Sequence, residues 1–212
     1  NLNNAYGFIE NYTENNVIID KELDGTGIDD RFIGVDPTWE QGEAEVVYKY
    51  LDPNICTSVL EIGAGSGKVS HYINRKLKDP TKHYVVEPGA ENFADIGQYL
   101  QKNKEKMGDK YFIDKRKIED IPLSDIKNVL GELPTCIVSD CEGCTLNYYK
   151  TTPRIFTNLK CIINEMDAPN MKDEPTYSKE LRDLWGRKGF KQTVIGCGCN
   201  LACCDTEVWL KK

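Results

Sequence analysis

The residues best suited to chemistry lie in a glycine-rich segment, Glu61–Gly67, which begins inside a short apolar run. Glycines let the chain turn tightly and let a ligand approach the backbone closely. A phosphate-binding P-loop would need glycine at position 62, where the chain has Ile62. The dinucleotide pattern G-x-G-x-x-G fits Gly63 and Gly65 but fails at Lys68. What remains is a loop of the form E-x-G-x-G-x-G.

Glu87 and Pro88 follow a second apolar run and form a candidate nucleoside contact. An acidic side chain at the end of a strand can accept hydrogen bonds from the hydroxyls of a ribose. Glu87 lies 26 residues after Glu61, close to the offset of roughly 20 residues typical of such an acid. A glutamate at a strand end is common by itself, so the glycine loop is what makes this residue a candidate.

Three more carboxylates follow later apolar runs: Asp140, Glu165 and Asp167. Strands that follow one another in the chain often lie side by side, so we expect these acids to be neighbours. Like charges close together raise the pKa of one of them, which would suit a general base toward an alcohol. The same acids could instead hold a divalent cation, cap helices or face solvent.

Short apolar runs alternate with helical patterns along most of the chain. Strands are predicted at 58–62, 84–86, 111–113, 136–138 and 161–163, helices at 40–51, 68–78, 90–104 and 178–188, and two final strands at 192–195 and 207–210. This alternation predicts an α/β, Rossmann-like fold: a seven-stranded, mostly parallel sheet with helices on both faces and a C-terminal antiparallel hairpin strand. Ligands bind at the carboxyl ends of strands in such sheets, where the candidate residues lie.

Composition limits the classes of partner. The 212 residues include 27 Lys and Arg against 34 Asp and Glu, a net charge of −7, which disfavours nucleic acid. No run of about 18 apolar residues is present, so no membrane span is expected. No signal-peptide pattern is visible either, and we therefore expect a cytoplasmic protein.

The nine cysteines are an odd number, and free thiols in a reducing compartment are the expectation. Cys141 and Cys144 have the spacing of a redox pair, although no thioredoxin-like pattern surrounds them. A second group of cysteines lies near the end of the chain, at Cys197, Cys199, Cys203 and Cys204. Their spacing does not match a usual zinc site, and the role of the group stays open.

The glycine loop resembles motif I of class I S-adenosylmethionine-dependent methyltransferases, and the chain resembles the FkbM family of these enzymes. Four segments match in the family's order over about residues 55–167: VLEIGAGSGKVS (59–70), HYVVEPGAENFADIGQYLQKN (83–103), VSDCEGC (138–144) and CIINEM (161–166). Two features depart from the family. Motif I often reads Asp-x-Gly-Ala-Asn there, and a small residue is usual at Cys144. These departures leave the substrate subclass open.

The resemblance implies methyl transfer from S-adenosylmethionine to a hydroxyl, most often of a sugar or natural product. We expect a methyltransferase domain at 39–212, and at 1–38 an N-terminal extension or substrate lid. The residues expected to bind the cofactor are Gln41 (or Glu43), Glu61, Gly63, Ala64, Gly65, Gly67, Glu87, Pro88, Ile118 and Asp140. Asp140 is the first candidate for the base or its orienter, followed by Glu165 and Asp167.

The expected partner is a small-molecule or glycan acceptor, in a parent polypeptide that could contain a glycosyltransferase. A divalent cation at Asp140, Glu165 and Asp167 is possible but not predicted. Two alternatives remain. The acceptor could be a non-sugar small molecule or a protein side chain, or the chain could be a non-catalytic binding domain of the same fold.

Overall fold

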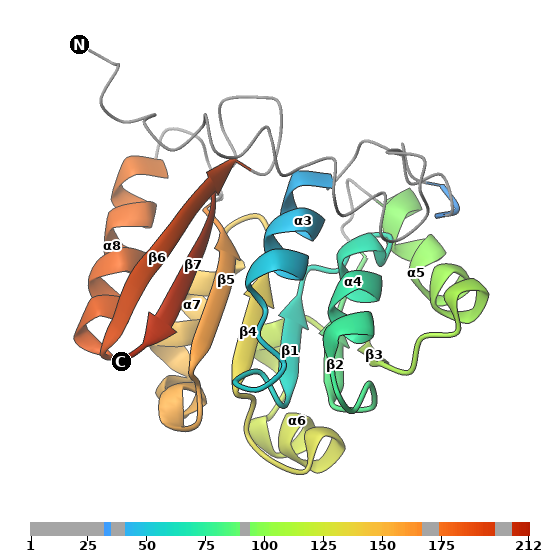
Figure 1. Cartoon of the computed structure of the whole chain (residues 1–212), viewed down its shortest axis with the longest axis horizontal. Coiled ribbons are helices and arrows are strands. Elements are labelled where there is room, and N and C mark those ends of the chain that lie inside the picture. Colours follow the sequence, from blue (N-terminus) through green and yellow to red (C-terminus); the bar gives the residue numbers. More distant parts are fainter. Residues whose placement is uncertain (1–31, 35–40, 90–93, 167–173, 198–204) are drawn as a thin grey trace.

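The structure is a computed structural model that describes residues 32–34, 41–89, 94–166, 174–197 and 205–212. Within these ranges the strands are β1 (Val59–Ile62), β2 (His83–Val86), β3 (Phe112–Asp114), β4 (Cys136–Ser139), β5 (Cys161–Glu165), β6 (Phe190–Cys197) and β7 (Asp205–Lys211). The helices are α3 (Gln41–Tyr50), α4 (Lys68–Lys76), α5 (Ala94–Met107), α6 (Leu123–Leu130), α7 (Cys144–Thr151) and α8 (Glu174–Arg187), with 3-10 turns η1 (Ile118–Asp120) and η2 (Pro153–Thr157) (Figure 1).

The strands form one sheet in the order β3-β2-β1-β4-β5-β7-β6. β1 to β5 run parallel, and β7 pairs antiparallel with both β5 and β6. The predicted fold class is therefore confirmed, including the C-terminal antiparallel hairpin. The strand order reverses between β1 and β4, where Ile62 lies beside Ser139. Such a switch point is where open α/β sheets bind their ligands.

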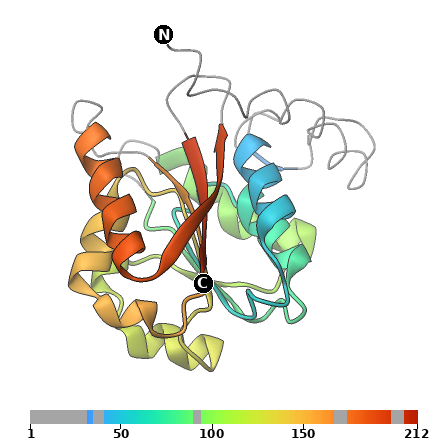
Figure 2. The ribbon, with the colours of Figure 1, turned by 60° about the vertical axis from the view of Figure 1, so that its left-hand side comes forward.

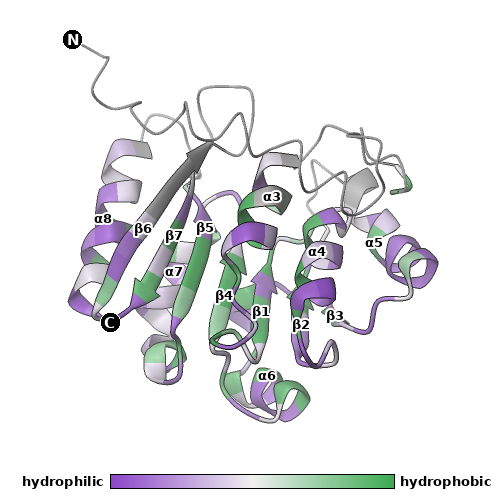
Figure 3. Ribbon diagram, in the orientation of Figure 1, coloured by the Kyte–Doolittle hydropathy of each residue, from purple (hydrophilic) through white to green (hydrophobic). Residues whose placement is uncertain are grey.

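Helices cover both faces of the sheet, because α3 and α4 lie on one side and α6, α7 and α8 on the other (Figures 1 and 2). Alternate residues of each strand point to opposite faces. Leu60 and Ile137 pack in the core under α6 to α8, whereas Val59 and Val138 pack against α3 and α4. The central strands are accordingly hydrophobic on both sides (Figure 3).

Two helices, α6 and α7, were not predicted from the sequence. Each has eight residues, too few turns for a hydrophobic period to stand out. Neither has a side-chain cap, since α6 follows Pro122 and α7 follows Gly143. No helix within the described ranges is long and apolar enough to cross a membrane.

Most of the predicted extension at 1–38 lies outside the described residues. The short stretch that is described packs against α5. The Ile33 N–H donates to Asn103 Oδ1 at 2.7 Å, and Asn103 Nδ2 donates back to the Ile33 carbonyl at 3.2 Å. The domain boundary itself stays a prediction.

Candidate functional site

The glycine loop joins the ends of β1, β2 and β4. The Gly63 N–H donates to the Val86 carbonyl, and the Asp140 N–H donates to the Ile62 carbonyl, both at 2.9 Å. Gly63 has φ +84°, and a Cβ there would lie 1.5 Å from the Asp140 carbonyl oxygen. Only glycine fits so close to a neighbouring backbone. The loop and Asp140 are therefore held as one unit at the switch point.

Glu87 extends from the end of β2 over this loop. Its Oε2 accepts the Gly65 N–H and its Oε1 accepts the Gly89 N–H, each at 2.8 Å. Burial raises the pKa of Glu87, while the backbone hydrogen bonds oppose the shift. The Ala64 backbone also hydrogen-bonds Glu87. A carboxylate has about four acceptor positions, so acceptor capacity remains for a ligand hydroxyl. Pro88 is exposed beside it.

Glu61 points away from the rim of the sheet, toward His83 at the start of β2. Its Oε2 lies 2.9 Å from His83 Nε2, and both side chains are buried. Its other oxygen, Oε1, is buried with no hydrogen-bond partner among the residues that the structure describes. That oxygen is free to accept one more donor, and the predicted cofactor role of Glu61 stays a prediction.

Three carboxylates meet at the end of β4. Oxygens of Glu43, Asp140 and Glu165 lie within 4.8 Å of one another. The structure thus brings together two of the three predicted acids, and Glu43 of α3 supplies the third carboxylate. Asp167 lies outside the described residues. Glu43 is only 4% exposed, whereas Asp140 and Glu165 are half-buried. The negative charge of this acidic cluster would attract a cation, such as an ammonium, a sulfonium or a metal.

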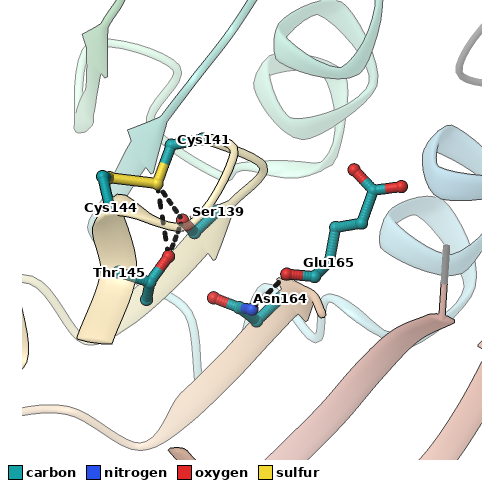
Figure 4. Close-up of a disulfide and its surroundings, with 6 residues drawn as sticks. All are labelled: Ser139, Cys141, Cys144, Thr145, Asn164 and Glu165. Atoms are coloured by element: carbon teal, nitrogen blue, oxygen red, sulfur yellow. Dashed lines mark hydrogen bonds between the residues drawn. A yellow bond between two sulfur atoms is a disulfide. The ribbon is translucent and has the colours of Figure 1, made fainter. Parts of the chain in front are cut away.

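A disulfide between Cys141 and Cys144 follows Asp140 directly (Figure 4). The expectation of free thiols is wrong for this pair. Glu142 has φ +50° and Gly143 has φ +90°, and this tight loop brings the two Cα atoms to 5.6 Å, a separation that a disulfide spans. Cys56, Cys136 and Cys161 are free, as expected. The Cys197–Cys204 grouping lies outside the residues whose side chains are described.

Hydroxyls pack against the disulfide at the start of α7. Ser139 Oγ and Thr145 Oγ1 are 2.8 Å apart, and Thr145 Oγ1 lies 3.3 Å from Cys141 Sγ. On the neighbouring strand, Asn164 Nδ2 donates to the Glu165 carbonyl, and the Glu165 side chain extends away from Asn164 (Figure 4). The ends of β4 and β5 are therefore held by short-range polar contacts.

Three other residues were predicted to contact the cofactor: Ala64, Ile118 and Gln41. Ala64 is buried against Val85 and Leu100. Ile118 lies in η1 and is 2% exposed, within the core under α6 to α8. Gln41 is the first residue of α3, and its side chain is outside what the structure describes. The contacts of these residues with the cofactor stay predictions.

Gly67 has φ +90° immediately before α4. A Cβ there would lie 2.7 Å from Leu100 Cδ1 and 3.1 Å from the Tyr111 hydroxyl. Glycine at this position therefore allows α5 to pack closely against the loop. The last glycine of the motif is therefore needed for this packing, in addition to any contact that it makes with a ligand.

The chain is similar in structure, at low sequence identity, to solved proteins that include methyltransferases. Magnesium protoporphyrin IX methyltransferase from Synechocystis PCC 6803, with bound S-adenosylmethionine, has a TM-score of 0.57 and 12% identity, over 82% of this chain and 80% of that one. Ribosomal protein L11 methylase from Lactobacillus delbrueckii subsp. bulgaricus has a TM-score of 0.56 and 12% identity, over 87% and 84%. Cofactor-bound Rv0187 from MTB has a TM-score of 0.57 and 13% identity, over 92% and 97%.

No protein-family model and no curated protein matches the sequence. The structural likenesses show that the chain has the Rossmann-like fold of class I S-adenosylmethionine-dependent methyltransferases. They do not show the FkbM family.

Proposed function

We propose that this chain is an S-adenosylmethionine-dependent O-methyltransferase whose acceptor is a hydroxyl of a sugar or glycan. The observation that carries the proposal is the convergence at the switch point. The glycine loop, Glu87 and Asp140 come from three different strands and meet at the edge where this fold binds ligands. The resemblance to the FkbM family supports the choice of acceptor.

The residues present fit this cofactor. The backbone at Gly63 and Gly65 leaves no side chain between the loop and a bound ligand, and Glu87 has acceptor positions for ribose hydroxyls. The acidic cluster of Glu43, Asp140 and Glu165 suits the positive charge that the cofactor carries. When bound, S-adenosylmethionine supplies a methyl group that is already activated toward an oxygen nucleophile.

The protein must then align the acceptor hydroxyl and remove its proton. We expect Asp140 to accept that proton at a carboxylate oxygen. Oxygens of Glu43 and Glu165 lie within 4.8 Å of it and add negative charge around the expected site of the reaction. Carboxylates also accept hydrogen bonds from several hydroxyls at once, as a sugar acceptor would offer.

Calorimetric titration of S-adenosylmethionine into the full chain, with NAD as the control ligand, tests the cofactor. We expect saturable binding of S-adenosylmethionine alone, weakened in Glu87→Gln. A panel of sugar, non-sugar and peptide hydroxyl acceptors, scored by methyl transfer, then tests the acceptor. Binding without transfer to any acceptor would favour the non-catalytic alternative, and absence of S-adenosylmethionine binding would overturn the proposal.

A further inference from the structure

Three buried thiols lie together at the amino ends of the central strands, on the edge of the sheet opposite the candidate site. Cys136 and Cys161 are the first residues of β4 and β5 and lie side by side in register. Cys56 precedes β1. All three are free, and none is more than 1% exposed. This cluster is separate from the acids and the disulfide at the carboxyl ends of the strands.

The sulfur atoms are already grouped at nearly the spacing that a shared cation needs. The three Sγ atoms all lie within 4.8 Å of one another. Metal–thiolate bonds of about 2.3 Å place three sulfurs around one cation at separations of about 4 Å. Small side-chain adjustments would therefore close the group around an ion.

We propose that Cys56, Cys136 and Cys161 form a binding site for one soft, thiophilic cation of the class that includes Cu(I) and Zn(II). Sulfur is the only donor type in this group of described residues, and thiolates select such cations over Mg²⁺ or Ca²⁺. Binding breaks the S–H bonds of these thiols, forms metal–sulfur bonds and releases the thiol protons to solvent. No oxidation is involved.

Cys56 lies directly after a turn that contains an exposed residue. Cys56 follows the turn 52–55, in which Asn54 is exposed. The Cys56 N–H donates to the Asp52 carbonyl at 2.7 Å. Local opening of this turn would expose Cys56 without disturbing the strands. A cation that prefers three ligands, such as Cu(I), could be held by the thiols alone, whereas Zn(II) would need a fourth ligand.

The test is metal stoichiometry on the reduced full chain, titrated separately with Cu(I) and Zn(II) under anaerobic conditions and read by native mass spectrometry. Wild type is compared with Cys56→Ala. Val59→Ala is the matched control, because Val59 is a buried register neighbour of Cys136 and carries no sulfur. The other cysteines can bind metal too, so the readout is the difference between variants.

We expect wild type and Val59→Ala to bind one more equivalent of one of the two cations than Cys56→Ala binds. The cation that shows this difference identifies the ion. Circular dichroism verifies folding, and Cys136→Ala gives an independent reading if Cys56→Ala does not fold. Equal stoichiometry in wild type and the cysteine variants, for both cations, would overturn the proposal. This result does not depend on methyl transfer.

Discussion

Asp140 is the candidate general base, and its role can be tested directly by substitution. Asp140→Asn keeps the shape of the side chain and removes the proton acceptor. We expect kcat for methyl transfer to fall about 10²- to 10⁴-fold, the usual range for loss of a general base. Affinity for S-adenosylmethionine, measured by calorimetry, should change much less.

Asp79→Asn is the control, because Asp79 is exposed in the turn before β2, at the amino end of that strand. It should leave turnover unchanged. Full turnover by Asp140→Asn would remove Asp140 as the base and move that role to Glu43 or Glu165, the other two acids of the cluster.

Asp114, at the end of β3, should make stability depend on pH. Hydrogen bonds from Arg116 lower its pKa to about 2, against burial and together with the Tyr84 hydroxyl at 2.5 Å. A carboxyl whose folded-state pKa is lowered stabilises the protein above its unfolded pKa of about 3.9. That contribution is lost as the pH falls from about 4 toward 2.

Asp114→Asn should therefore lower the free energy of unfolding by about 1–2 kcal/mol at pH 7, since the half-exposed Arg116 weakens the pair through solvent. Urea unfolding should show nearly the same difference from wild type at pH 7 and pH 5, and a smaller difference at pH 3. The exposed pair of Asp183 and Lys179 is the comparison, and Asp183→Asn should change stability much less than Asp114→Asn does. A difference that grows as the pH falls would contradict this assignment.

The glycine loop is the element whose conformation is most constrained. In Gly63→Ala the new Cβ would meet the Asp140 carbonyl oxygen at 1.5 Å, in a left-handed backbone conformation. We expect a loss of about 3–5 kcal/mol, from overlap with backbone and from the left-handed conformation. Gly89→Ala is matched in φ, at +73°, but meets nothing within 4 Å. It should cost only about 1 kcal/mol. Similar losses in thermal unfolding would contradict this reading of the loop.

The elements also show which parts of the fold and site the sequence predicts. Strands such as β1 and β4 are apolar runs bounded by turn residues, and Gly63, Glu87 and Asp140 follow strand ends, so their convergence was predictable. The helices α6 and α7 were not, because eight residues give little periodicity. Glu43 joins Asp140 only through the packing of α3 across the end of the sheet, a contact between residues 97 positions apart. No local pattern encodes such a contact.

At the scale of the whole molecule, binding of the cofactor should raise the free energy of unfolding. Its expected contacts come from β1, β2 and β4, at the centre of the strand order. A ligand at 100 times its Kd adds about 2.7 kcal/mol to the free energy of unfolding. For a chain of this size, that raises Tm by roughly 5–10 °C. Thermal unfolding with S-adenosylmethionine should show this rise, and NAD should not produce it.

Glu87→Gln should reduce the rise, because it removes acceptor capacity where the ribose hydroxyls are expected, while the loop keeps its glycines. An equal rise with both ligands would indicate a general nucleoside site rather than a methyltransferase site. A rise that persists undiminished in Glu87→Gln would place the ligand elsewhere on the sheet edge. We expect the reduced rise in Glu87→Gln, because a ligand at the switch point would contact the strand ends that Glu87 and the glycine loop connect.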